Sequence, residues 1–514
     1  MTTVCLLMLY PLNFALFMTP GLVPALLLVR RQKWPVSWAA LLAVVGPATA
    51  GVFVFWAYFL HPVVGRVASA AVLLISAGCL VALVRCRPLR EMASQPDVFV
   101  PLALMFLITL VYFGFLGILF TASGGDVDKR VRDRFSNLSL AADDIIPALF
   151  AEHLYAGTDP REILGDWHSS DRPPLQTGLV LVQRPLADYC GPPLVQYHML
   201  GTIFQCTWVV AVWALGRKLG LNGGRLALVF AFCTTASFFF FHSLYVWPKL
   251  LAGTLTIVPV VLLVRQGPPA GLAEVLVAAL AAGLALLAHP GSAFTLLAVA
   301  LFLLRPSRFP GIGKVLAGMA VCVALQAPWV AYQRWYDPPG DRLLKWHMAG
   351  VIDIDERPSG QTVRDAYSSI SPLEIAGHKW ANLQALCGRP LFEPTLRGTT
   401  WRAVWKNGEY YNLLKALGVL NVGWLVLAFT WFSNRADPGL AELRTLMALA
   451  VLGLAGWLLL MFGPGTTMIY QGAFATVILL FVGLATAVSR LPNVLVGVLL
   501  AIQVLDIIII WLIP

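Results

Sequence analysis

The chain has 514 residues, of which 59% are hydrophobic and 12% are charged, and its formal net charge is +10. With a mean hydropathy of +0.77, it is far too apolar for one or several soluble domains of ordinary composition. These values exclude a soluble globular protein and predict an all-α polytopic membrane protein.

Runs of roughly 20 apolar residues predict membrane-spanning helices, because that length crosses ~30 Å of hydrocarbon. In chain order these runs predict about fourteen spans, of which the ninth is short. The first run is too long for a signal peptide and lacks a small-residue cleavage site after it, so it is interpreted as a span. The predicted spans are 4–29, 36–60, 65–86, 98–122, 197–216, 224–246, 248–265, 271–288, 292–304, 313–333, 412–432, 441–462, 470–489 and 493–513.

Basic residues concentrate in alternate connections between these spans, as at Arg30-Arg31 and Arg217-Lys218. Because Lys and Arg near helix ends are retained in the cytoplasm, this pattern puts those connections inside and both termini outside. The positive charge is therefore a topology signal and gives no support for nucleic-acid binding. Arg, Ala, Gly, Leu and Val are abundant, which is typical of GC-rich bacteria, so we expect a bacterial inner membrane.

The opposite face carries two long polar loops, 123–196 and 334–411, which hold 11 and 9 of the 26 acidic residues. Function is expected in these outer loops, together with juxtamembrane helices. The chain then divides into a three-helix membrane unit (1–97), a transmembrane core that includes the first loop (98–333), the second loop, and C-terminal transmembrane helices (412–514).

An acid pair, Asp143-Asp144, lies in the first loop before apolar residues that recur at helical spacing as far as Leu154. One interpretation is structural, because acids at a helix N-terminus cap it and complement its dipole. The other is chemical: one carboxylate is a general base that takes a proton from an acceptor hydroxyl. Both can hold, because the capping acid and the catalytic acid need not be the same residue.

The acid pair, the short segment 151–157 (Ala-Glu-His-Leu-Tyr-Ala-Gly) and Arg172-Pro173-Pro174-Leu175 follow one another in this loop. In this order they resemble the first outer loop of GT-C glycosyltransferases, nearest to the protein O-mannosyltransferase and lipid A aminoarabinose transferase families. The segment 214–219 (Ala-Leu-Gly-Arg-Lys-Leu) is similar to the basic end of the next span in those families, and the likeness is looser through the turn at 287–290.

The sequence departs from the family pattern in two informative ways. The acidic loop follows the fourth span, whereas in the families it follows the first, so 1–97 is an added unit. Arg172 stands where the families have a His, which suits a permanent phosphate contact. Two registers align the acids, and Asp143 is acidic in both.

The resemblance implies an inverting transferase that moves a sugar from a polyprenyl-phosphate donor to a lipid, glycan or protein acceptor on the outer face. It implies Asp143 or Asp144 as the base, with Asp171 as a second acid. Permanent cations would hold the donor phosphate and stabilise charge on the leaving group. The candidates are Arg172, Lys249, Arg342 and Lys345, for which ordinary interfacial anchoring is the alternative.

Two other functions fit the same features: a lipid-linked glycan transporter or flippase, and a glycan ligase or polymerase that uses a diphosphate carrier. Transporters place ionisable groups near the bilayer midplane, where this chain has little charge beyond Asp506, which is expected to be paired or functional. No ligand spacing identifies a metal site or a cofactor, although loop carboxylates suit a divalent ion. Cys190 and Cys387 are either a disulfide between the outer loops or two free thiols.

Overall fold

The computed structural model of the protein describes residues 3–120, 142–190, 193–387, 401, 405, 412–433, 438–463 and 474–512. Within these ranges the chain is helical apart from connections and one short hairpin, in which β1 (Glu162–Leu164) pairs antiparallel with β2 (Trp167–His168). The prediction of an all-α membrane protein is confirmed at this level.

Nine helical segments in the described ranges are long and apolar enough to cross a membrane. They match predicted spans, while the total number of crossings stays a prediction. Their elements are α1 (Thr3–Gln32); η1 (Val36–Trp38), α2 (Ala39–Leu42) and α3 (Val45–Leu60); α4 (Pro62–Arg85); α6 (Pro96–Phe120); α10 (Pro193–Gln205) and α11 (Trp208–Lys218); α17 (Ile312–Ala331) and η5 (Tyr332–Tyr336); α22 (Leu413–Leu417), η8 (Gly418–Asn421) and α23 (Val422–Ser433); α24 (Pro438–Leu460); and α26 (Asn493–Ile507) and η9 (Ile508–Leu512).

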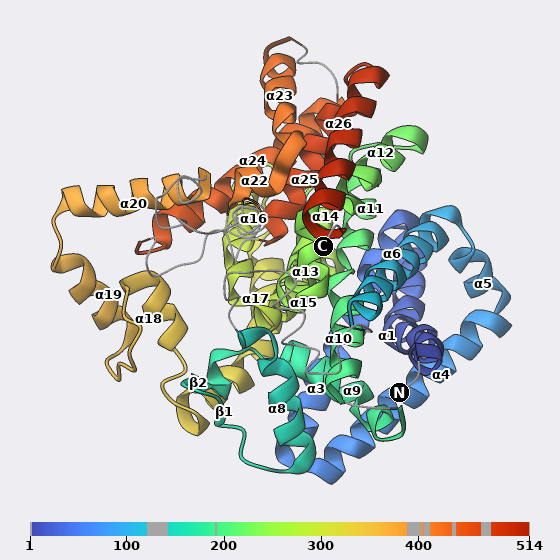
Figure 1. The fold of residues 1–514 in the computed structure, drawn as a ribbon, viewed down its shortest axis with the longest axis vertical. Helices are drawn as coiled ribbons and strands as arrows, with labels where there is room; N and C mark the ends of the chain where they lie inside the picture. Colours follow the sequence, from blue (N-terminus) through green and yellow to red (C-terminus); the bar gives the residue numbers. More distant parts are fainter. Residues whose placement is uncertain are drawn as a thin grey trace.

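The remaining predicted spans correspond to shorter or bent helices. α12 (Gly223–Thr234) and α13 (Ser237–Leu244) together are long enough, but they meet at a bend of 58°. α14 (Lys249–Leu263) and α25 (Phe474–Val488) are short and buried along almost their whole length, near the centre of the helix assembly (Figure 1). A helix that is apolar on all sides is stable only when neighbours surround it. The other short elements are α15 (Leu272–Ala288), η4 (Pro290–Ser292) and α16 (Ala293–Leu303).

The N-terminal helices pack directly on the first outer loop. α3 and α4 lie against α9 (Leu175–Cys190), the amphipathic helix that ends this loop. The α3–α9 contact is set by two glycines, because a Cβ on Gly178 would lie 2.0 Å from the Gly51 carbonyl oxygen. The three-helix unit is therefore part of the wall that positions the first loop.

The two loops contain most of the remaining helices. The first loop has η2 (Ala142–Asp144), α8 (Ile146–Ala156), the β1–β2 hairpin and η3 (Ser169–Asp171) before α9. The second has α18 (Arg342–Ala349), α19 (Ser359–Ser368) and α20 (Pro372–Cys387), which extend along one side of the molecule (Figure 1). We call the side of the molecule that carries these two loops, with the helix ends next to them, the loop face.

The opposite helix ends form a basic face, as the alternate connections predict. Arg217 pairs with Asp97 at 3.0 Å, and Lys218 pairs with Glu442 at 3.0 Å, so connections far apart in sequence meet there. Arg308 donates to the Arg265 carbonyl oxygen at 2.7 Å. α5 (Arg87–Ala93) also lies in one of these connections. Which face is cytoplasmic remains a prediction.

Two further predictions concern Asp506 and the cysteines of the outer loops. Asp506 accepts a hydrogen bond from Trp405 Nε1 at 2.9 Å, and its Oδ1 lies 3.9 Å from Lys415 Nζ. The pairing expected for this acid is therefore present. The side chain of Cys190 lies outside the described residues, and so does the hypothesis of a Cys190–Cys387 disulfide.

Candidate functional site

The acid pair occupies η2, immediately before α8. The N-cap of α8 is Ile145, whose side chain makes no capping hydrogen bond. Neither acid occupies the N-cap position of α8, so capping by an Asp143 or Asp144 side chain stays a prediction. The carboxylates still lie at the positive end of the helix dipole.

Asp143 is held by three elements at the loop face. Its Oδ2 pairs with Arg172 Nη2, and its Oδ1 accepts a hydrogen bond from Trp247 Nε1 at 2.9 Å. Lys249 Nζ lies 3.6 Å from the centroid of the Trp247 ring. We call Asp143, Arg172, Trp247 and Lys249 the Asp143 cluster; each is less than a tenth exposed.

Local chain geometry explains why these side chains meet. Arg172 precedes Pro173 and is extended (φ −122°, ψ 115°), as a residue before proline must be, which ends η3 and directs the chain into α9. Lys249 is the first residue of α14 and follows the Trp247-Pro248 turn. Residues from η2, the η3–α9 junction and the α13–α14 turn therefore converge at one point.

The cluster is rich in buried donors for an anion. The guanidinium carbon of Arg172 lies 4.6 Å from the centroid of the Trp167 ring. The Nε of Arg172 is buried and has no hydrogen-bond partner among the described residues. Each cation thus lies against an indole ring, which favours a partly desolvated positive charge. Two cations and one carboxylate can receive a phosphate with geometry that a single Lys cannot supply.

Asp144 has different surroundings. Its side chain is fully buried, and its backbone carbonyl oxygen accepts a hydrogen bond from the Tyr197 hydroxyl. Gln176 Nε2 donates to the same hydroxyl oxygen at 3.0 Å. These bonds fix η2 against α9 and α10, so Asp144 occupies the inner side of the acid pair.

The other predicted residues lie in a second group, between the hairpin and α18. Arg342 pairs with Asp166, and its Nη1 lies 3.6 Å from the Asp171 carboxylate. Lys345 Nζ lies 2.8 Å from Asp341 and donates to the Asp355 carbonyl oxygen. The structure therefore brings Arg172 and Lys249 to Asp143, whereas Arg342 and Lys345 are engaged by loop carboxylates and carbonyls.

Asp171 belongs to this second group. It accepts a hydrogen bond from the His168 backbone N–H at 3.0 Å, and only 5% of the residue is exposed. Burial raises the pKa of its carboxyl above the ordinary value, although Arg342 and the His168 N–H act in the opposite direction.

Sequence reasoning missed a network that links the two loops. The buried Asp337 carboxylate accepts from the Ser169 hydroxyl at 2.6 Å and from the Ser170 N–H at 2.9 Å, and it lies 3.1 Å from His168 Nδ1. Ser169 also bonds the Tyr332 hydroxyl at 2.5 Å. The only signal in the sequence was an Asp before two prolines, which reads as a turn.

No role for Trp167 or Trp247 was predicted from the sequence. Among the described residues, no group of three or more His, Cys, Asp or Glu side chains could hold a metal ion. No family model, curated protein or solved structure matches the chain.

Proposed function

We propose that this protein is a GT-C-like glycosyltransferase that moves a sugar from a polyprenyl-phosphate donor to an acceptor at the loop face. The observation that carries the proposal is Asp143, held beside Arg172, Trp247 and Lys249 where η2, the start of α9 and the α13–α14 turn meet. A lipid-linked phosphate lies at the membrane surface, where the loop face is expected, and a buried carboxylate beside two cations provides both a base and a phosphate site.

In the proposed reaction, the acceptor hydroxyl oxygen attacks the anomeric carbon of the sugar while Asp143 takes the hydroxyl proton. The bond between the anomeric carbon and the phosphate oxygen breaks, and that oxygen leaves with the electron pair. Arg172 and Lys249 stabilise the negative charge that develops on the phosphate. The products are the glycosylated acceptor and polyprenyl phosphate.

The ion pair between Arg172 and Asp143 gives the reaction an order. Asp143 Oδ2 is engaged by the guanidinium, so an acceptor hydroxyl can use it only after Arg172 turns toward a phosphate. The Arg172 Nε, which has no partner among the described residues, supplies a further donor for that phosphate. Donor binding would thus precede activation of the acceptor.

A transporter or flippase also places charged groups at helix ends and turns, but it would move its lipid without breaking the sugar–phosphate bond, so an assay of sugar transfer separates it from the transferase. A ligase or polymerase with a diphosphate carrier would use the same cations. Binding measurements separate the transferase from the ligase. The parent protein in lipid nanodiscs should bind polyprenyl monophosphate, detected by native mass spectrometry.

Arg172→Gln and Lys249→Met should each weaken that binding about 10–100-fold, the effect of losing one charge-assisted hydrogen bond. Arg161→Gln is the matched control, because Arg161 is half exposed and pairs with Asp159 on the same loop. Clearly tighter binding of a diphosphate carrier would favour the ligase. Equal monophosphate binding in all variants would contradict the proposal.

A further inference from the structure

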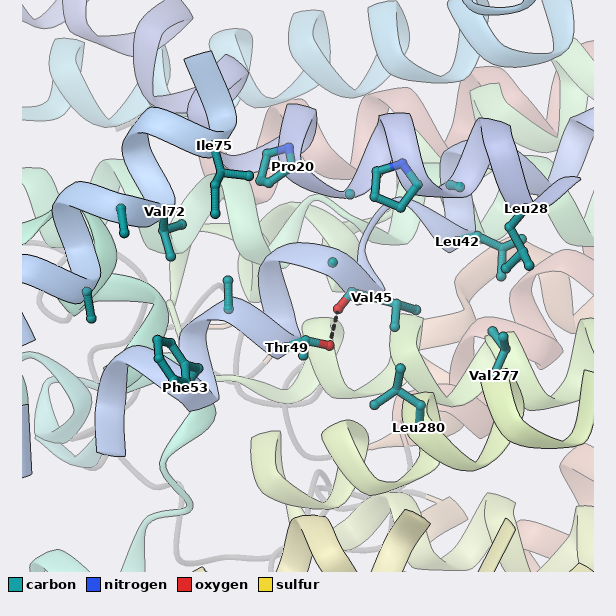
Figure 2. Close-up of a pocket in the computed structure, with 17 residues that line it drawn as sticks. Pro20, Leu28, Leu42, Val45, Thr49, Phe53, Val72, Ile75, Val277 and Leu280 are labelled. Carbon is teal, nitrogen blue, oxygen red and sulfur yellow. Dashed lines mark hydrogen bonds between the residues drawn. The ribbon is translucent and has the colours of Figure 1, made fainter. Parts of the chain in front are cut away.

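A cavity of about 600 Å³ lies among α1, α3, α4 and α15, away from the Asp143 cluster. Figure 2 shows apolar side chains from these helices pointing into it, including Phe53, Val72 and Leu280. Among its lining residues, Thr49 has the one polar side chain, and its hydroxyl donates to the Val45 carbonyl oxygen at 2.8 Å. A water molecule would find no partners there, so the cavity suits hydrocarbon.

The walls of this cavity are set by backbone contact. α1 and α3 touch at Gly21 and Gly46, where a Cβ on Gly46 would lie 2.4 Å from the Gly21 Cα. Side-chain rearrangement cannot bring these two helices closer. The cavity is also built almost wholly by the N-terminal unit, with Val277 and Leu280 of α15 as its other side.

One face of α3 connects the cavity to the loop face. The α3 residues that line the cavity recur at helical spacing from Val45 to Phe53, and Trp56 continues the row one turn later. The Trp56 and Tyr332 ring centroids are 6.4 Å apart, and the Tyr332 hydroxyl bonds Ser169. From Gly46 to Trp56 the helix rises only about 15 Å.

We propose that this cavity receives the hydrocarbon chain of the lipid-linked donor, a polyisoprenoid, whose phosphate lies at Arg172 and Lys249. The inference rests on the proposed function and gives the N-terminal unit a role in it. A phosphate fixed at the loop face leaves the chain to run into the bilayer, and the α3 row offers an apolar path. Phe53, which is 63% exposed, lies on that path.

The test compares a long polyprenyl phosphate with an analogue of two isoprene units. Ala71 lines the cavity and is exposed, so Ala71→Phe obstructs it without displacing backbone. Ala70→Phe is the matched control, on an exposed neighbour of the same helix that does not line the cavity. The parent and Ala70→Phe should bind the long lipid at least about tenfold more tightly than the short one.

Ala71→Phe should lose most of this chain-length preference and keep its affinity for the short analogue. An unchanged preference in Ala71→Phe, with binding still sensitive to Arg172→Gln, would overturn this inference and leave the proposed function standing. If the parent showed no phosphate-dependent binding of either lipid, both this inference and the proposed function would be overturned.

A second measurement does not depend on how Ala71→Phe folds. A photo-crosslinking amino acid at Phe53 should label a radioactive long polyprenyl phosphate, and an excess of the unlabelled lipid should abolish the signal. Labelling of bulk phospholipid alone would show that an ordinary acyl chain occupies the cavity, and would contradict the inference.

Discussion

Asp143 and Asp144 are adjacent in the chain, but their side chains lie in different surroundings. Asp143 meets Arg172 and Trp247, whereas the Asp144 backbone is tied to Tyr197 and its carboxyl is fully buried. A base must reach the proton that it accepts, and a phosphate must reach the cations beside it. On these grounds we assign the proposed base to Asp143 and a positioning role to Asp144.

The buried carboxyl of Asp171 should make the stability of the protein depend on pH. Burial raises the pKa of its carboxyl in the folded state, so the folded protein holds this proton to a higher pH than the unfolded chain. Stability should therefore fall as pH rises from about 4, the ordinary value, to the folded pKa, and then level off. Asp171→Asn cannot ionise, and its side-chain oxygen can still accept from the His168 N–H.

We expect the difference in Tm, Asp171→Asn minus parent, to grow as pH rises through that window. Thermal unfolding in detergent at a series of pH values measures it. Asp353→Asn, which alters an exposed carboxylate of the second loop, supplies the baseline. A difference that shrinks with rising pH would show that the charge pair with Arg342 outweighs burial.

At this scale, residue type predicted part of the candidate site. Arg172 and Lys249 stood out because a cation beside proline or tryptophan at a helix end is chemically conspicuous. The pairing of Arg342 with Asp166 could not be predicted, because 176 positions separate the partners. The Asp337–Ser169 contact could not be predicted for the same reason, since it depends on how two loops fold together.

At the scale of elements, α8 directly follows the acid pair in η2, and a clamp holds α8 to α9. Arg184 of α9 donates to both Glu152 carboxylate oxygens, at 2.5 and 2.8 Å, and to Asp188 at 2.6 Å. The Tyr155 hydroxyl donates to Asp188 at 2.5 Å. The clamp therefore holds the C-terminal half of α8 against α9.

Arg184→Met should lower stability by about 1–3 kcal/mol. A fully buried pair would cost ~3–5 kcal/mol, but both carboxylates are more than a third exposed, which screens the interaction. Loosening α8 should also slow sugar transfer. Tm and transfer rate, measured on the same preparation, check both effects.

Arg66→Met is the matched control, because the exposed Arg66 lies over the same Tyr155 ring at 4.8 Å and, among described residues, has no carboxylate within ion-pair distance. Its stability should stay within about 0.5 kcal/mol of the parent. Equal losses in the two variants would mean that α8 is held by ring contacts and not by the clamp.

Periodicity and hydropathy predicted most transmembrane elements because apolar runs are long and unambiguous. They did not predict β1–β2, whose strands are too short to show alternation, or the bend between α12 and α13. The helices α18 to α20 lie in a polar stretch, where periodicity alone does not distinguish a surface helix from a loop.

For the whole molecule, the charge pattern predicts which face is outside. Ser368 is exposed in the second loop, and Ser94 is exposed beside α5 on the basic face. In a variant lacking the native cysteines, Ser368→Cys should react with an impermeant reagent in intact spheroplasts. Ser94→Cys should react only after lysis, and the opposite result would invert the topology.

The boundary at residue 97 stays a prediction, but the segment before it packs closely on the first loop. The sequence suggested that 1–97 was an addition to a transmembrane core, yet α3 contacts α9 through Gly51 and Gly178. Close contact between two glycines leaves no trace in hydropathy, which is why the sequence alone could not reveal it.

The most direct test of the central claim is sugar transfer by the purified protein in liposomes. With a polyprenyl-phosphate-linked sugar as donor and cell-envelope extract as acceptor, release of free polyprenyl phosphate reports transfer whatever the acceptor is. The parent should release it. Asp143→Asn keeps an oxygen that can accept from Arg172 or Trp247, so it should fold and bind the donor, with a Tm lowered by the loss of the buried charge pair, while releasing polyprenyl phosphate ~10²–10⁴-fold more slowly. Release within a few-fold of the parent in Asp143→Asn would contradict the account.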